Sequence, residues 1–205
     1  MKFKDQEHLA EIIRVETLWQ GLRVLAELAK KHGVDDIFQD NGAKVVQQAV
    51  MMNFKLLPGR EGNDAEDEEG REWEMKSANV AKVSGFTTHH HLNHVILSKM
   101  RLVPWLFSFY HHIELTEAYV MTPEQLEPWF QAWQARLDGT FMKKGVIQPA
   151  VPSINNPKIP VKFVRDNGHL IYQAEQKILL NPIDVFKKAE GLKTDSSVKA
   201  IQVEP

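Results

Sequence analysis

Two carboxylates and a lysine occur in the sequence at a spacing that suits metal-assisted hydrolysis. Glu74 and Lys76 are two residues apart in a stretch, 71–77, whose alternating pattern predicts a β-strand. Side chains two apart on a strand point to the same face of a sheet, so these two groups are expected to lie side by side. Asp64 stands ten residues before Glu74 in a polar turn and can reach the same point.

These three residues predict the hydrolysis of a phosphodiester. Carboxylate oxygens bind Mg²⁺ while leaving positions for water and a phosphate oxygen. Such a metal lowers the pKa of bound water and neutralises developing charge, and a lysine can orient the water or stabilise the transition state. We predict Asp64 and Glu74 as catalytic metal ligands and Lys76 as the catalytic cation. A solvated surface strand could show the same short pattern, and the acidic run 66–69 is assigned no role.

A polar run follows the predicted catalytic strand and suits the reading of DNA bases. It contains three consecutive histidines, His89, His90 and His91, after Thr87 and Thr88. Imidazole can donate to guanine N7 or O6, and the amide of an asparagine such as those at 155–156 matches the edge of adenine. The alternatives are a chance metal-binding tract for the histidines and an ordinary turn for Asn-Asn-Pro.

The composition excludes several classes of protein. The chain has 205 residues, 43% of them hydrophobic, which suits one domain with one core. Its net charge of -2 lacks the strongly basic character of many nucleic-acid binders, although metal-binding carboxylates would offset basic residues. The absence of cysteine excludes disulfides, zinc–thiolate sites and thiol catalysis. No signal-like start or membrane-length apolar run occurs, so a cytoplasmic protein is expected.

The elements that must position these residues can be predicted from periodicity and capping signals. Helices are expected over residues 8–32, from 40–41 to 50, over 93–102, from Thr122-Pro123-Glu124-Gln125 onward, and between Asn181-Pro182 and Gly191. Strands are expected at 54–57, 71–77, 103–109, 113–120, 160–164 and 170–173, the last two joined in a hairpin by the turn Asp166-Asn167-Gly168. Residues 139–153 read as a loop. The alternation predicts an α/β (α+β) fold with a mixed sheet.

Several long segments resemble the type II restriction endonucleases of the PvuII type, within the PD-(D/E)xK superfamily. The similar segments stand in the same order and cover roughly residues 31–172: they are 31–42, 57–65, 85–91, 103–105 and 154–162. The resemblance implies a central mixed sheet flanked by helices. It also implies a Mg²⁺-dependent homodimer that cuts both strands of a palindrome in double-stranded DNA, CAGCTG, to blunt ends. A cognate DNA methyltransferase is expected in the same system, without a stable complex.

The resemblance also implies roles for single residues. Asp64, Glu74 and Lys76 take the catalytic places, and Asp40, with its neighbour Gln39, takes the place of an aspartate close to the DNA. His90, His91 and Asn156 are implied as major-groove base readers. The supporting DNA contacts are expected from Thr87, Thr88, His89, Asn155 and Lys158.

The implied organisation is an endonuclease domain over 1–174 and a C-terminal extension over 175–205. Within the domain, helices in 5–52 are expected to dimerise, 53–121 to form the catalytic core, and 122–174 to read DNA and form the hairpin. The extension has no counterpart, and we expect it to pack across the dimer or beside the DNA cleft. Other departures are the region before Lys31, the longer loop 139–153, and Met100, which replaces a tyrosine near the active site.

Two other functions remain open at this point. One is a related nuclease of the superfamily with a different target or a repair role. The other is a DNA-binding protein that recognises a sequence without cleaving it, although three intact charged residues favour an enzyme.

Overall fold

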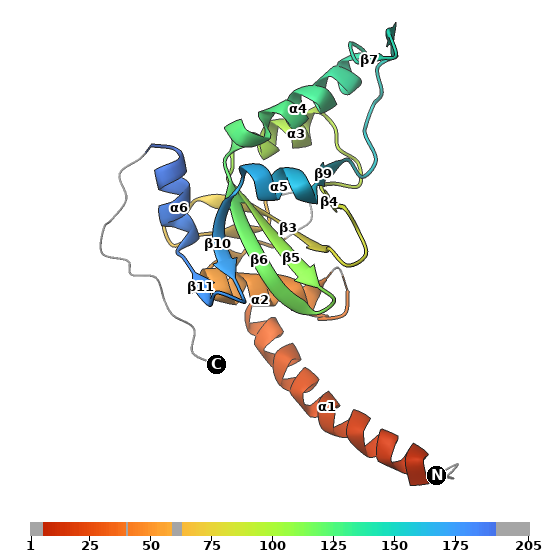
Figure 1. The fold of residues 1–205 in the computed structure, drawn as a ribbon, viewed down its shortest axis with the longest axis vertical. Coiled ribbons are helices and arrows are strands. Elements are labelled where there is room, and N and C mark those ends of the chain that lie inside the picture. The colour runs from red at the N-terminus through yellow and green to blue at the C-terminus, as the bar shows by residue number, and fades with distance from the viewer. Residues whose placement is uncertain (1–5, 40, 59–62, 192–205) are drawn as a thin grey trace. The chain divides into compact units, whose positions relative to one another are not determined.

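The computed structural model describes residues 6–39, 41–58 and 63–191 (Figure 1). The chain forms two compact units, Met1–Leu56 and Leu57–Pro205. Within the described ranges, no helix combines the length and the apolar character that crossing a bilayer requires. The predicted aspartate at position 40 lies outside the described residues.

The first unit consists mainly of two helices, as predicted. They are α1 (Gln6–Lys31) and α2 (Gly42–Met52), followed by the short strand β1 (Lys55–Leu56). Ala29, Ile37 and Val46 form a small buried core between them. The turn before α2 requires glycine at position 42, because a Cβ there would lie 2.4 Å from the carbonyl oxygen of Asp36.

The second unit is built on a mixed sheet, which confirms the predicted fold class (Figure 1). Its strands, in the order β2-β3-β5-β6-β10-β11, are β2 (Ala65–Glu66), β3 (Glu72–Asn79), β5 (Trp105–His111), β6 (Glu114–Met121), β10 (His169–Gln173) and β11 (Ile178–Leu179). Strands β3 and β5 run parallel, and the other neighbouring pairs are antiparallel.

Helices cover this sheet around an aromatic core. They are α3 (His94–Met100), α4 (Pro123–Asp138), α5 (Val161–Asn167) and α6 (Pro182–Ala189). The rings of Phe107 and Phe109 each pack edge-on against Phe86, with centroids 4.9 Å apart. The start of α4 has the predicted capping box: Thr122 N–H donates to Gln125 Oε1 at 2.8 Å, and Gln125 N–H donates back to Thr122 Oγ1.

Two small ribbons complete the second unit. One pairs β4 (Gly85–Thr87) with β9 (Lys158–Pro160), and the other pairs β7 (Met142–Lys143) with β8 (Val146–Ile147). The second ribbon lies inside residues 139–153, which the sequence pattern predicted as a loop. Lys144 and Gly145 at its tip both have positive φ, so the chain reverses within two residues.

The predicted hairpin around Asp166-Asn167-Gly168 is wrong. Residues 161–167 form helix α5, in which Val161 and Val164 are buried on one face. Lys162 Nζ lies 2.7 Å from Asp166 Oδ2, a pairing that only the helical i,i+4 spacing brings together. The buried apolar face therefore overrides the local turn signal, and the last strand of the predicted pair, β10, joins β6 instead.

The C-terminal part contains the predicted short helix and one further strand. Asn181 Oδ1 accepts from Ile183 N–H at 2.9 Å and caps α6, and Gly191 follows the helix with a φ of 69°. Strand β11 extends the sheet along β10. Residues 175–191 thus pack on their own unit, and residues 192–205 lie outside the described part.

Candidate functional site

The predicted catalytic residues meet at one point of the second unit. Lys76 Nζ lies 2.5 Å from Glu74 Oε1 and 3.5 Å from Asp64 Oδ2. Glu74 and Lys76 are two apart on β3, and Asp64 directly precedes β2, which pairs antiparallel with β3. Glu74 is buried, whereas 39% of the Asp64 side chain is exposed. One carboxylate therefore anchors the lysine inside the protein while the other borders solvent.

Backbone hydrogen bonds fix Asp64 against β3. Its N–H donates to the carbonyl of Trp73 at 3.0 Å, and its Oδ2 accepts from the N–H of Met75 at 2.7 Å. Trp73 and Met75 flank Glu74 in the chain, so Asp64 is attached on both sides of the second carboxylate. The separation of the two carboxylates is thereby set by the β2–β3 pairing.

The charges of the site depend on one another. Burial, with a smaller contribution from Asp64, raises the pKa of Glu74 to about 7, although Lys76 opposes the change. Burial alone would lower the pKa of Lys76, but attraction to Glu74 and Asp64 outweighs it, so the pKa is raised. Lys76 therefore stays protonated at neutral pH. The raised pKa of Glu74 means that a further positive charge beside it would favour its ionised form.

The donor set fits a magnesium ion. The described residues contain no cluster of three or more His, Asp or Glu side chains that could hold a metal. Mg²⁺ is commonly bound through one or two carboxylates, with water and substrate phosphate completing its shell, so Asp64 and Glu74 suffice. A zinc site of three or four protein ligands would not fit this pair.

The two predicted groups of base readers lie side by side although 64 residues separate them. The pairing of β4 with β9 continues beyond the strands: Thr88 N–H donates to Pro157 O, and Asn156 N–H donates to His89 O, both at 3.0 Å. Leu92 and Ile154 close the far end with a β-bridge. We call these paired segments, 87–92 and 154–158, the recognition ladder.

The side chains of the recognition ladder differ in what they offer a ligand. Exposed side chains are those of Thr87, His90, His91, Asn155, Asn156 and Lys158. Thr88 is buried, and its hydroxyl donates to Pro157 O at 3.0 Å, so its side chain holds the ladder together. Asn155 Oδ1 lies 3.0 Å from His91 Nδ1 and fixes the orientation of that ring.

His89 belongs to the recognition ladder and is influenced by the charge of Lys76. It is half-buried, and its Nδ1 accepts a hydrogen bond from His91 N–H at 3.0 Å. Burial and the charge of Lys76 lower its pKa, with smaller contributions from His90 and His91. The ring is therefore neutral at pH 7, with its proton on Nε2 because Nδ1 is an acceptor.

Gln39 belongs to the first unit. Its side chain is exposed in the turn before α2, and its carbonyl accepts from Gly42 N–H at 2.7 Å. The structure therefore gives Gln39 an exposed position on its own unit, and its predicted DNA contact stays a prediction.

Asp67 is a residue whose importance the sequence pattern did not indicate. Its side chain is fully buried and accepts from the backbone N–H groups of Glu69 and Arg71 and from the indole N–H of Trp73, at 2.8–2.9 Å. It lies in the run of four acidic residues at 66–69, a pattern that usually indicates a solvated surface. A glycine three positions after Asp67, with a φ of 79°, was the available sign of a tight turn.

Met100 occupies the place where the resemblance expects a tyrosine. It is buried in the aromatic core, and its carbonyl accepts from the indole N–H of Trp105 at 3.1 Å. The methionine thus fills the core without offering a hydroxyl to the site.

A comparison with known families agrees with this geometry. The family model described as restriction endonuclease PvuII matches residues 10–172, more than three quarters of the chain. The match begins further upstream than the segments that first indicated the resemblance, and it ends in β10. The chain belongs to the restriction endonuclease PvuII family and is a type II site-specific deoxyribonuclease, a hydrolase of phosphodiester bonds.

Proposed function

We propose that this endonuclease uses Mg²⁺ to cut double-stranded DNA at CAGCTG, leaving blunt ends. The observation that carries this proposal is the meeting of Asp64, Glu74 and Lys76 at strand β3, which contacts β4, the strand from which the recognition ladder continues. The catalytic strand and the ladder thus belong to neighbouring parts of the same unit. A nuclease that reads bases needs this proximity, because the bond it cuts lies within the sequence it reads.

The catalytic residues have separate roles in this proposal. Asp64 and Glu74 hold Mg²⁺, which when bound supplies a Lewis acid for the phosphate and acidifies a water. Lys76, kept protonated by the two carboxylates, donates to the attacking water or to the phosphate oxygens and stabilises charge in the transition state. Water attack in line with the leaving group gives a 5′-phosphate and a 3′-hydroxyl.

The recognition ladder supplies the base readers. His90 and His91 are exposed and offer donors to guanine, and the exposed amide of Asn156 matches adenine. Asn155 orients His91, and Thr87 and Lys158, which face each other across the β4–β9 pair, suit contacts to the DNA backbone. Thr88 and His89 support the ladder from inside. Gln39 and Asp40 are proposed to lie close to the DNA and couple recognition to cleavage.

A palindromic target suits a homodimer. A two-fold symmetric protein presents one active site to each strand of a two-fold symmetric sequence. We propose that α1 and α2 form the dimer contact. The enzyme is expected to act in the cytoplasm beside a methyltransferase that protects the host's own copies of the sequence.

Digestion of a plasmid of known sequence tests the proposal. The purified chain with Mg²⁺ is expected to give discrete fragments, and sequencing their ends should show CAGCTG divided at its centre. The variant Asp64→Ala should bind the same plasmid without cutting it, and Asp166→Ala, which removes an exposed carboxylate elsewhere, should cut normally. An intact plasmid would contradict the nuclease assignment, and ends at another palindrome would contradict only the target.

A further inference from the structure

Residues 175–191 lie beyond the family match yet are firmly attached to the second unit. Tyr172 and Gln173 of β10 pair with Leu179 and Ile178 of β11, and Leu180 N–H donates to Ile171 O at 2.7 Å. Helix α6 then buries Pro182, Ile183 and Phe186 on one face. Residues spaced by three on a helix form such a face, so the segment packs as an integral part of the unit.

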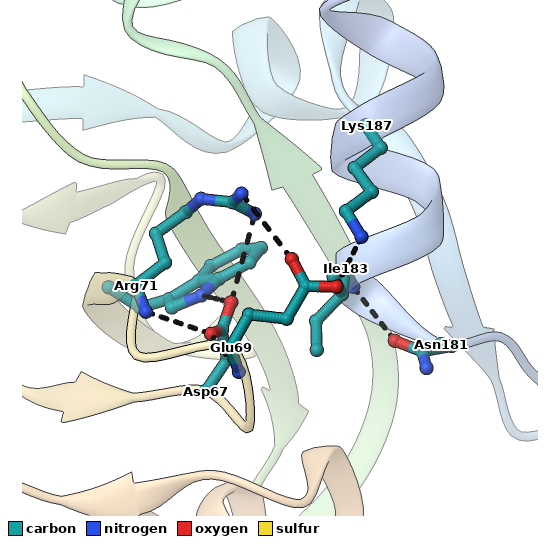
Figure 2. Close-up of polar contacts among 7 residues, drawn as sticks. Asp67, Glu69, Arg71, Asn181, Ile183 and Lys187 are labelled. Atoms are coloured by element: carbon teal, nitrogen blue, oxygen red, sulfur yellow. Dashed lines mark hydrogen bonds and ion pairs between the residues drawn. The ribbon is translucent and has the colours of Figure 1, made fainter. Parts of the chain in front are cut away.

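The buried face of α6 covers the turn between β2 and β3. The Phe186 ring packs edge-on against Trp73 with centroids 5.7 Å apart, and the Arg71 guanidinium lies 4.7 Å from the centre of the same ring. Lys187 forms an ion pair with Glu69 (Figure 2). Helix α6 therefore holds Glu69 through an ion pair, Arg71 through a cation–π contact and Trp73 through an aromatic pair.

The same turn is held from inside by Asp67. Its carboxylate accepts from the backbone N–H of Arg71 (Figure 2) and from the indole N–H of Trp73 at 2.8 Å. The Trp73 ring is thus fixed on two sides, by the carboxylate of Asp67 and by the ring of Phe186.

Trp73 is the residue through which the turn reaches the catalytic carboxylates. It precedes Glu74 in the chain, and its carbonyl accepts from the N–H of Asp64. A shift of the Trp73 backbone would consequently move both proposed metal ligands. Sites that hold a metal need their ligands placed to within about 0.5 Å, and supporting residues provide that placement.

We propose that α6 is a positioning element for the metal site, with Phe186 holding Trp73 and thereby the spacing of Asp64 and Glu74. This inference rests on the proposed function for its metal and for its catalytic readout. Phe186 touches neither the metal nor the DNA in this proposal, so it is a positioning residue. Its loss should weaken metal binding and leave the recognition ladder unchanged.

The test compares full-length variants for Mg²⁺ dependence, metal affinity and DNA affinity. Phe186→Ala should raise the Mg²⁺ concentration for half-maximal single-turnover cleavage by roughly 10–100-fold. It should weaken binding of Mn²⁺ alone, measured by electron paramagnetic resonance, by a comparable factor. Binding of the plasmid site in metal-free buffer should not change, and Phe186→Leu, which keeps an apolar side chain against Trp73, should restore most of the loss.

Two further variants keep the test decisive if Phe186→Ala does not fold. Lys187→Met removes the ion pair to Glu69 and should shift the Mg²⁺ dependence in the same direction by a smaller factor. Lys188→Met, at the neighbouring exposed position, should have no effect. The positioning role would be overturned if a folded Phe186→Ala kept the Mg²⁺ dependence and the Mn²⁺ affinity of the wild type. If only Lys187→Met folds, the same result for that variant would overturn it. A wild-type chain that cleaves no DNA would instead refute the proposed function, and the Mn²⁺ measurement would still decide the role of α6.

Discussion

Among single residues, Asp67 illustrates how a buried side chain in a turn can support a neighbouring candidate site. Its buried carboxylate satisfies three donors at once, from Glu69, Arg71 and Trp73. Removing it leaves those donors without their acceptor inside the protein, where an unsatisfied group is costly. The loss should also disturb the proposed catalytic residues, because the carbonyl of Trp73 accepts the hydrogen bond from Asp64 N–H.

We predict that Asp67→Ala lowers the free energy of unfolding by roughly 3 kcal/mol. Urea unfolding followed by tryptophan fluorescence measures the change. Asp166→Ala is the matched control, since its exposed i,i+4 pair with Lys162 should be worth less than about 0.5 kcal/mol. Equal stabilities of the two variants would mean that the Asp67 hydrogen bonds contribute little beyond those made with water.

The residues of the site differ in how far the sequence could predict them. Strand alternation correctly placed Glu74 and Lys76 on one face, because that periodicity is a property of the backbone. The ladder between the histidines and the asparagines joins residues 64 apart; the family resemblance implied a shared role for them, and their pairing was not predicted. Asp67 was missed because its burial depends on the packing of helix α6 against the turn, and these two segments lie more than 100 residues apart in the sequence.

Among the elements, α5 is attached to the sheet by a network on β6. Arg165 donates to both carboxylate oxygens of Glu117 at 2.7 and 3.0 Å, and the Tyr119 hydroxyl donates to the same carboxylate at 2.8 Å. Burial alone would raise the pKa of Glu117, but these hydrogen bonds and the charge of Arg165 outweigh it, so the pKa lies below its usual value. The Glu117 carboxylate thus stabilises the folded state while it is ionised.

This network predicts a pH-dependent contribution to stability. The folded pKa of Glu117 is depressed below the ordinary 4.5, so the stabilisation is present above pH 4.5 and is lost as pH falls through the folded value. Glu117→Gln should therefore cost about 1 kcal/mol at neutral pH, and the cost should shrink at lower pH. Thermal unfolding across a pH series measures it. A cost that is constant with pH, or one matched by the exposed Glu114→Gln, would contradict the role of the ionised pair.

The elements themselves were predicted well wherever a local signal has no competitor. Both partners of the capping box, Thr122 and Gln125, lie within four residues of the sequence, and α4 begins where this box predicts. The predicted hairpin at 166–168 failed because its signal is equally local, whereas Val161 and Val164 gain their burial from the rest of the unit. Turn residues at the end of a short amphipathic stretch do not distinguish a helix end from a strand reversal.

For the whole molecule, the proposed dimer depends on the apolar surface of α1. This helix exposes several large apolar side chains within its own unit: Ile13, Val15, Leu18, Trp19, Val24 and Leu28. Burying one leucine side chain contributes about 1.5–3 kcal/mol. A second copy of the chain could supply that burial.

Leu18→Glu is predicted to weaken the dimer by roughly tenfold to a hundredfold, since 1.4 kcal/mol corresponds to a factor of ten. Sedimentation across a concentration series measures the dissociation constant, and nicked rather than linearised plasmid should accumulate. Gln20→Glu adds the same charge at another exposed position of α1 and serves as the control. A Leu18→Glu protein that stays dimeric would place the interface elsewhere.

The recognition ladder has a consequence for how target preference can evolve. His89 and Asn156 share a backbone hydrogen bond, and His91 and Asn155 share a side-chain contact, so the two segments of proposed base readers support each other. A substitution in one segment therefore alters the support of the other segment. New specificities should therefore arise through paired changes on both segments, and libraries that vary the histidines alone should yield mostly inactive proteins instead of retargeted ones.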